Sequence, residues 1–384
     1  MPVVDGGGGV PSGVRAPARR EAYRAAGVDV DAGERAVALM RAAVASTRRP
    51  EVVGGLGGFA GAIEIPAGYR RPLLVASTDG VGTKTALARA GGGLGGLGID
   101  LVAMCADDVV CTGAEPLFLL DYVAVGRLVP EEIAEVVAGV AAGCRAAGCA
   151  LLGGETAEHP GTMASTGLDL AATCVGVVER DEAIDGSAVR TGDLLVGLEA
   201  SGLHSNGFSL VRRLVAEARL DLDGPYADLL AARSAGAAPE AVHANASLRD
   251  VLLTPTRIYA RAVLAIREAV RAAGADVHGI AHVTGGGLPG AVPRIVPDGL
   301  AARINPTAWP MPSVMRLLGG IGGLDDAEIR ATFNGGLGMV LAIPPDAVRA
   351  AIAAATEAGI GACVAGEIVA AADVGGARYV EVAR

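Results

Sequence analysis

One junction between a strand and a helix limits the possible folds of this chain more than any other feature. The apolar run Leu73–Ala76 has the character of a buried strand, and a helical run begins near Thr85. Between them lies Ser77-Thr78-Asp79-Gly80-Val81-Gly82-Thr83-Lys84. Glycines let backbone N–H groups approach a phosphate closely, and a carboxylate can hold Mg²⁺ beside it. The spacing is not that of a Walker A loop. The junction predicts an α/β fold whose turn either binds phosphate or is an ordinary polar connection.

Further glycine-rich and polar motifs follow in order along the chain. They occupy Asp100–Phe118, Gly153–Glu158, Gly202–Ser209, Thr254–Tyr259, Ala281–Leu288 and Thr332–Met339. Together with the junction, they resemble the phosphoribosylformylglycinamidine cyclo-ligases, also called AIR synthetases. The resemblance extends from about Tyr23 to the C-terminus. Each motif alone is shared with related enzymes, and the whole set is specific.

Size, charge and cysteine content narrow the class of protein. A chain of 384 residues predicts two domains, and its net charge of −10 argues against binding to nucleic acid or to an anionic membrane surface. Uncharged runs stay below the roughly 18 residues that a membrane-spanning helix needs. The six cysteines are scattered without a Cys-x-x-Cys pair, which favours a cytoplasmic location.

The order of elements predicts two α/β domains with mixed sheets. We expect a disordered arm over residues 1–20, an N-terminal domain for nucleotide binding and dimerisation over 21–185, and a C-terminal α/β domain over 186–384. Helices are predicted over 31–45, 99–110 and 130–147, with strands over 73–77, 117–125 and 150–153. Residues 221–250 have the pattern of an irregular connector. The run 93–98 satisfies the dinucleotide-binding formula, but it follows a helix instead of a strand, so we expect a loop there.

Three carboxylates are candidate metal ligands: Asp79, Asp108 and Glu155 are each expected at or after the end of an element. Asp108 is otherwise a polar residue on an exposed helix face. Asp79 and Lys84 are also candidate catalytic residues. Gly80, Gly82, Thr83 and Lys84 are candidates for phosphate binding, and Lys84 alternatively pairs with a carboxylate on the surface. Relatives often carry a second lysine where this chain has Ala86.

A second group of residues is expected to face the substrate. His204, Ser205 and Asn206 precede a helix, whose N-terminus favours anions, although Ser205 or Asn206 is alternatively only an N-cap. Arg257 is a candidate phosphate clamp or a structural ion pair. His282 precedes Gly285 and Gly286 and is either a substrate-facing acid–base residue or a buried core histidine. The segment Val53–Gly61, with Gly57 and Gly58, is a candidate lid over ATP.

The resemblance implies a reaction and an assembly. The expected reaction is the ATP- and Mg²⁺-dependent cyclisation of formylglycinamidine ribonucleotide to 5-aminoimidazole ribonucleotide through an iminophosphate. The expected assembly is a homodimer in which strands of the two N-terminal domains form a barrel. Other ATP-using enzymes of the same superfamily and a noncatalytic nucleotide-binding scaffold are the alternatives. The scaffold predicts a missing carboxylate among Asp79, Asp108 and Glu155, and all three are present.

Overall fold

The N-terminal half is built on a four-stranded mixed sheet with helices on one side. A computed structural model describes residues 21, 23–55, 57–234 and 238–383, so the arm expected over 1–20 lies outside the described residues. The sheet has the order β3-β6-β4-β5, and only β4 and β5 are parallel. Its strands are β3 (Pro72–Gly80), β4 (Glu115–Val125), β5 (Ala150–Glu158) and β6 (Leu168–Glu179).

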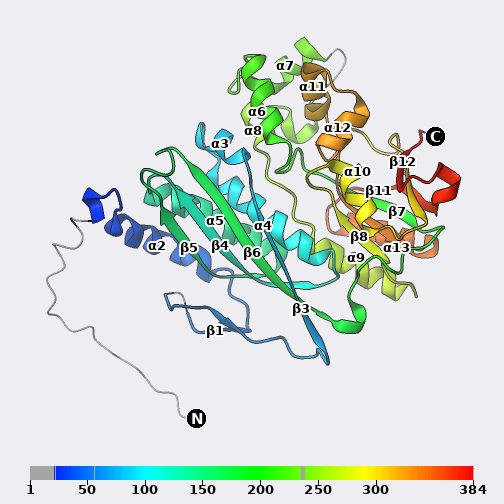
Figure 1. Ribbon diagram of the computed structural model, residues 1–384, viewed down its shortest axis with the longest axis horizontal. Helices are drawn as coiled ribbons and strands as arrows, with labels where there is room; N and C mark the ends of the chain where they lie inside the picture. The colour runs from blue at the N-terminus through cyan, green and yellow to red at the C-terminus, as the bar shows by residue number, and fades with distance from the viewer. Residues whose placement is uncertain (1–20, 22, 56, 235–237, 384) are drawn as a thin grey trace.

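Helices cover one face of this sheet and leave the other open (Figure 1). Helices α4 (Leu94–Val110) and α5 (Pro130–Ala147) pack behind the strands, and α2 (Val30–Ala45) packs against α5. The short helix α3 (Lys84–Arg89) follows β3, and a small hairpin of β1 (Val52–Val53) and β2 (Ala62–Ile63) precedes it. On the open face Leu74, Leu120 and Tyr122 are exposed, because alternate residues of each strand point away from the helices.

The C-terminal half contains a six-stranded sheet of order β12-β9-β11-β7-β10-β8. Its strands are β7 (Leu194–Glu199), β8 (Gly279–His282), β9 (Leu300–Ile304), β10 (Leu337–Ile343), β11 (Ala362–Ala370) and β12 (Tyr379–Glu381). Helices α9 (Ala260–Ala272) and α13 (Val348–Glu357) pack together beside it, and α9 also contacts α4. The expected class, α/β with mixed sheets in both halves, is confirmed.

Most of the remaining helices form a layer with its own apolar core. Helices α6, α7, α8 and α11 gather at the top of Figure 1. The bounds are α6 (Phe208–Glu217), α7 (Tyr226–Arg233), α8 (Leu248–Leu252), α10 (Gly287–Ala291), α11 (Ser313–Gly322) and α12 (Asp326–Thr332). Two of these helices correct the irregular connector expected over 221–250.

The glycine-rich run 93–98 is also different from the expected loop, because α4 already begins at Leu94. Its glycines let α4 approach α5 closely. A Cβ on Gly98 would lie 2.3 Å from the Val136 carbonyl oxygen, and one on Gly139 would lie 1.9 Å from the Gly95 oxygen. The glycines therefore serve helix packing, and the low helix propensity of glycine is outweighed by burial of the contact.

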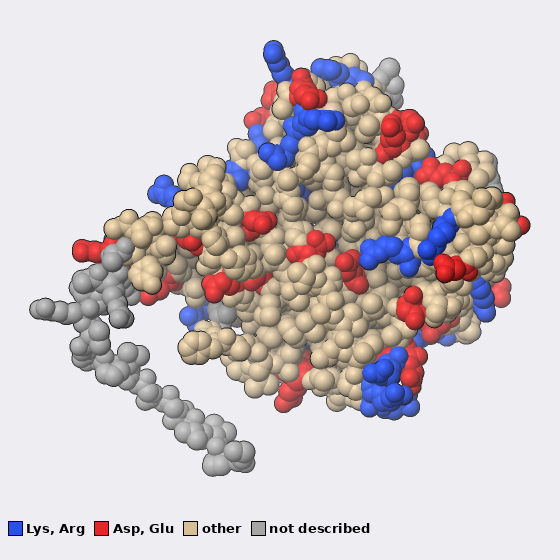
Figure 2. All heavy atoms as spheres, viewed as in Figure 1, with Lys and Arg blue, Asp and Glu red and all other residues tan. Residues whose placement is uncertain are grey.

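The surface carries charge of both signs. On the face in Figure 2, acidic side chains lie across the middle of the molecule, and basic side chains gather above them over the helical layer. None of the described helices is both long enough and apolar enough to cross a membrane. Since the chain carries a net charge of −10, an anionic ligand would need individual basic groups or backbone N–H groups to hold it.

Candidate active site

A histidine–aspartate pair joins the two halves of the chain. Asp108 lies in the last turn of α4, and His282 ends β8. The His282 Nδ1 atom is 2.9 Å from Asp108 Oδ1, and Ser77 of β3 donates to Asp108 Oδ2 at 3.2 Å. Burial alone would raise the pKa of Asp108, but the hydrogen bonds from His282 and Ser77 and the His282 charge lower it overall. The ionised carboxylate is thus favoured.

This pairing determines which nitrogen of His282 is available for chemistry. A carboxylate can only accept a hydrogen bond, so Nδ1 carries the proton, and in the neutral ring Nε2 keeps its lone pair. Nε2 is buried and has no hydrogen-bond partner among the described residues. The ring is therefore oriented by Asp108 with one unused basic nitrogen, as a proton acceptor requires.

Asp79 supplies a second carboxylate beside this pair. It lies near the end of β3, two residues after Ser77, and its Oδ1 accepts from the Gly80 N–H at 2.7 Å. Burial is the main reason that the pKa of Asp79 is raised, and the charge of Asp108 raises it further. Two neighbouring carboxylates, one of them destabilised by the other, form a site suited to a cation.

Glycines and small polar residues form the mouth next to these groups. Gly82 has a φ of 65° and an open side, and Gly285 and Gly286 are exposed. A Cβ on Gly285 would lie 3.6 Å from Asn206 Oδ1, so those two segments face each other. Thr83 and Ser209 bring the two halves of the chain together, with their hydroxyl oxygens 3.2 Å apart. Thr83, Asn206 and these glycines thus lie on neighbouring segments, and their contact with a ligand stays a prediction.

Lys84 does not point to this mouth. Its side chain is fully buried, with Nζ 2.8 Å from Asp100 Oδ2. Nζ also donates to the backbone oxygens of His204 and Thr254, each at 3.0 Å, so all three ammonium donors are used. This contradicts the expected catalytic contact with phosphate and corresponds to the alternative of a carboxylate pair, in the core instead of on the surface.

Two side chains of the turn His204-Ser205-Asn206 are buried, those of His204 and Ser205. His204 is 1% exposed, and its Nε2 accepts from the Ser201 N–H at 3.2 Å. Burial is the main reason that the pKa of His204 lies well below its usual value, so the ring is neutral. Ser205 is buried with its hydroxyl 3.1 Å from that of Thr256. Both residues support the turn, which corrects the expected ligand contact for their side chains.

The Arg257 side chain has no hydrogen bond to His282 or Asp108 and is hydrogen-bonded elsewhere. One of its terminal nitrogens donates to the Gly359 carbonyl at 3.3 Å, and Nε is buried without a hydrogen-bond partner among the described residues. It therefore forms neither of the expected arrangements in full. Its role as a phosphate clamp stays a prediction.

Glu155 is separated from Asp79 and Asp108, which corrects the expected three-carboxylate metal site. It lies inside β5, whereas β3 is the opposite edge of the sheet. A register shift between Leu119 and Leu120 also places Glu155 opposite Tyr122, on the open face. Asp79 lies on the other face, in the row of Ala172 and Asp121. The described residues contain no cluster of three or more His, Cys, Asp or Glu side chains that could hold a metal ion.

The candidate lid is an exposed hairpin loop between β1 and β2. Gly57 has a φ of 109°, and a Cβ added there would meet open space. Gly58 is exposed as well, and the neighbouring Phe59 is the most exposed of the large apolar side chains. These features are compatible with a segment that closes over a ligand, and the lid stays a prediction.

Comparisons with known proteins decide the family. Residues 60–178 match the family described as AIR synthase related protein, N-terminal domain, and residues 190–377 match the corresponding C-terminal domain. The chain is 50% identical to a phosphoribosylformylglycinamidine cyclo-ligase of Thermosynechococcus vestitus over 91% of its own length and 97% of the relative. It is 46% identical to that of Geobacillus kaustophilus over 93% and 99%. The chain belongs to the phosphoribosylformylglycinamidine cyclo-ligase family.

Solved structures share the fold of this cyclo-ligase family at low sequence identity. A thiamine-monophosphate kinase from Stenotrophomonas maltophilia matches 90% of this chain and 95% of its own, with a TM-score of 0.63 and 19% identity. The hydrogenase maturation protein HypE in complex with ATP matches 91% and 90%, with a TM-score of 0.61 and 22% identity. These proteins therefore share the fold of this chain.

Three further aspartates of this cyclo-ligase family member were not singled out from the sequence. Asp100 accepts from Lys84 and from the backbone N–H and hydroxyl of Thr256. Asp107 accepts from the Tyr259 N–H at 2.8 Å. Asp121 is partly buried, its Oδ2 atom has no hydrogen-bond partner among the described residues, and burial raises its pKa to about 7. The sequence did carry a signal for Asp100 and Asp107. They are seven residues apart and so lie on the same face of a largely apolar helix, where an acidic residue is rare unless it has a partner.

Proposed function

We propose that this chain catalyses the ATP-dependent cyclisation of formylglycinamidine ribonucleotide to 5-aminoimidazole ribonucleotide, with ADP and phosphate as the other products, in purine biosynthesis. Its membership of the cyclo-ligase family, over nearly the whole chain, supports this function. The single structural observation that carries it is the Asp108–His282 pair with its unused Nε2 beside Asp79.

The chemistry requires activation of an oxygen that is a poor leaving group. The γ-phosphoryl group of ATP is transferred to the formyl oxygen, which gives an iminophosphate. The amidine nitrogen then attacks the formyl carbon, the C–O bond breaks, and phosphate leaves with the former formyl oxygen. The attacking nitrogen must lose a proton, and His282 Nε2 accepts it while Asp108 stabilises the resulting imidazolium.

The carboxylates next to His282 fit a magnesium ion. Asp79 and Asp108 offer hard oxygen ligands, and burial, followed by the charge of Asp108, raises the pKa of Asp79. Mg²⁺ bound there would neutralise phosphoryl oxygens of ATP during the transfer.

The glycine-rich mouth offers backbone N–H groups and room for phosphates. Gly80 ends β3, Gly82 and Thr83 lie between β3 and α3, and Gly285 and Gly286 precede α10. We assign ATP and the ribonucleotide to this mouth, with Asn206 between its two sides. Closure of the Val53–Gly61 loop would exclude water, which would otherwise hydrolyse the iminophosphate.

We infer that the protein acts as a homodimer in the cytoplasm. The open face of the N-terminal sheet presents Leu74, Leu120 and Tyr122, which are 56%, 40% and 39% exposed. A second copy packed on this face would bury them in a barrel of strands. Free thiols at all six cysteines suit a reducing compartment. Light scattering on a Leu120→Asp variant tests the dimer, since the expected result is a monomer.

The test of the function is amidine-dependent ATP turnover by the purified chain. We expect ADP and 5-aminoimidazole ribonucleotide in equal amounts for the wild type. Asp79→Asn should keep the melting profile and nearly abolish turnover, whereas the exposed control Asp346→Asn should retain it. Unchanged turnover of Asp79→Asn at saturating Mg²⁺ would reject the site, and absence of product from the wild type would reject the function.

A further inference from the structure

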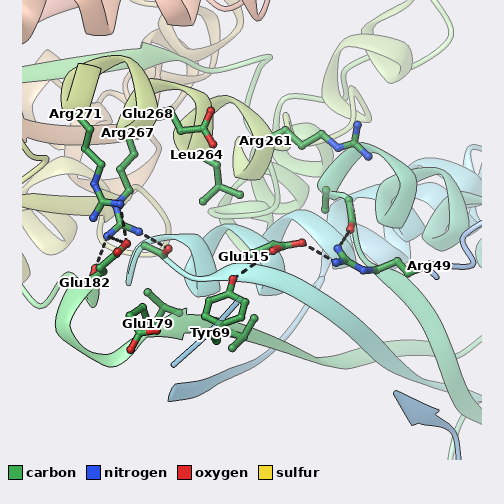
Figure 3. A pocket seen from close by; sticks show the side chains of 15 residues that line it. Arg49, Tyr69, Glu115, Glu179, Glu182, Arg261, Leu264, Arg267, Glu268 and Arg271 are labelled. Carbon is green, nitrogen blue, oxygen red and sulfur yellow. Dashed lines mark hydrogen bonds and ion pairs between the residues drawn. The ribbon is translucent and has the colours of Figure 1, made fainter. Parts of the chain in front are cut away.

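A second pocket lies between the two halves of the chain, away from the mouth of the candidate active site. It has a volume of about 420 Å³ and is lined by the start of β4, the end of β6 and one face of α9 (Figure 3). Because β3 and β6 are antiparallel, Val178 at this pocket is opposite Leu73, at the far end of β3 from Gly80. The pocket is thus at the opposite end of the sheet from the glycine-rich mouth.

Most charges in this pocket neutralise one another. Arg49 pairs with Glu115 at 2.7 Å, and Arg271 pairs with Glu182 at 2.7 Å. Glu179 accepts from two backbone N–H groups, and the buried Arg267 donates to the Gly113 carbonyl at 2.8 Å. These groups form the walls of the pocket and already have partners.

Two lining residues of α9 are different. Among the residues that the structure describes, the side chains of Arg261 and Glu268 have neither an ion pair nor a hydrogen bond. Both are exposed, and they are seven residues apart, so their Cα atoms are separated by two helical turns, roughly 10 Å. Leu264 lies between them on the same face, and the Tyr69 ring lies across the pocket (Figure 3).

We propose that this pocket binds a small elongated zwitterion of the ω-amino carboxylate class. Its carboxylate pairs with Arg261, its ammonium group pairs with Glu268, and its methylene chain lies on Leu264 and Tyr69. A ligand with one charge would leave either Arg261 or Glu268 unpaired, and a zwitterion with adjacent charges would be too short to reach both. A bound ligand contacts both halves of the chain, because Tyr69 and Leu264 belong to different domains.

The experiment measures binding of 6-aminohexanoate by titration calorimetry, with the ligand-induced rise in melting temperature as a second readout. Hexanoate and hexylamine each carry one of the two charges, and glycine carries both on adjacent groups. We expect saturable binding of 6-aminohexanoate in the millimolar range and at least threefold weaker binding of the other three. Absence of saturable binding, or equal binding of hexanoate or hexylamine, would overturn the proposal.

Variants test the two contacts separately. R261Q and E268Q should each weaken binding about threefold to fivefold, as expected for exposed ion pairs. The charge-exchanged double variant R261E/E268R should restore binding to within about twofold, with the ligand reversed. The exposed controls R349Q and E357Q on α13 should bind like the wild type. Wild-type affinity of both R261Q and E268Q, or failure of the folded double variant to recover binding, would contradict the assigned contacts.

Discussion

Helix α4 carries two carboxylate–base pairs, and they differ in whether the base keeps a hydrogen-bonding group without a partner. The Asp100–Lys84 pair is fully buried, and all three donors of Lys84 have acceptors. The Asp108–His282 pair is 2.9 Å long and leaves Nε2 without a partner among the described residues. A pair with every donor used can only hold segments together, whereas a pair with a free basic nitrogen can exchange a proton. The comparison separates a structural site from a reactive one.

A third aspartate of α4 shows the cost of burying a carboxylate without a cation. Asp107 accepts from the Tyr259 N–H, as Asp100 does from the Thr256 N–H, so both hold the segment that leads into α9. Asp107 has no ion pair among the described residues, and burial raises its pKa to about 7. Lys84 provides for Asp100 the positive charge that Asp107 lacks.

The largest expected effect is on the reactive pair. His282→Ala should lower amidine-dependent turnover about 10²- to 10⁴-fold, because the proton acceptor is lost, while ATP affinity changes little. His278→Ala is a matched control, since His278 forms a similar 2.8 Å pair with Asp193 on the same sheet. Melting temperature, nucleotide affinity and specific activity are measured on one preparation. Full activity per folded molecule of His282→Ala would make the ring a core residue.

Substitutions in the Asp100–Lys84 pair should lower the unfolding free energy and not the turnover rate. Lys84→Met leaves Asp100 buried without its cation, which should cost about 3–5 kcal/mol of unfolding free energy. The folded fraction should keep substantial specific activity. The double variant Lys84→Met/Asp100→Asn should recover part of the loss, measured by urea unfolding. A stable Lys84→Met protein without activity would instead return Lys84 to the catalytic residues.

The unpaired aspartate predicts a pH dependence of stability. Its pKa is about 7 in the folded chain and about 3.8 when unfolded, so folding takes up a proton between these values. Stability from this group is therefore present below pH 4 and is lost as pH rises to 7. Relative to the wild type, Asp107→Asn should gain up to about 1.4 kcal/mol per pH unit across that window. A stability difference that is constant from pH 5 to 8 would contradict the raised pKa.

The smallest effect is expected from Thr256, which supports Asp100 beside Lys84. Thr256→Val removes a hydroxyl donor 2.6 Å from Asp100 and keeps the backbone donor. The loss of unfolding free energy should be about 1.5 kcal/mol, since the acceptor is charged but retains other donors. A loss as large as that of Lys84→Met would show that the hydroxyl, and not the ammonium group, stabilises Asp100.

Local sequence patterns predicted much of the fold because they report local physics. The helix expected over 130–147 has the observed bounds of α5, with Pro130 at its start and two glutamates in the first turn. The helix over 31–45 differs from α2 by one residue. The glycine run 93–98 was assigned wrongly, because its helix depends on contact with α5, 40 residues away along the chain.

In the candidate active site, too, contacts between residues far apart along the chain could not be predicted from local sequence patterns. Asp108 and His282 are 174 residues apart, and their contact follows only from the tertiary arrangement of α4 and β8. The sequence pointed to both residues but not to their contact. The partner of Lys84 and the register shift that displaces Glu155 also depend on tertiary contacts. Acidic residues seven apart within an apolar helix were a usable signal for Asp100 and Asp107.

The proposed chemistry is tested most directly by following one oxygen atom. Formylglycinamidine ribonucleotide labelled with ¹⁸O in the formyl group is turned over with unlabelled ATP, and the released inorganic phosphate is analysed by mass spectrometry. Transfer of the γ-phosphoryl group to the formyl oxygen predicts one ¹⁸O atom in each phosphate that is released. Unlabelled phosphate, with the ¹⁸O recovered in water, would contradict the iminophosphate and the proposed mechanism.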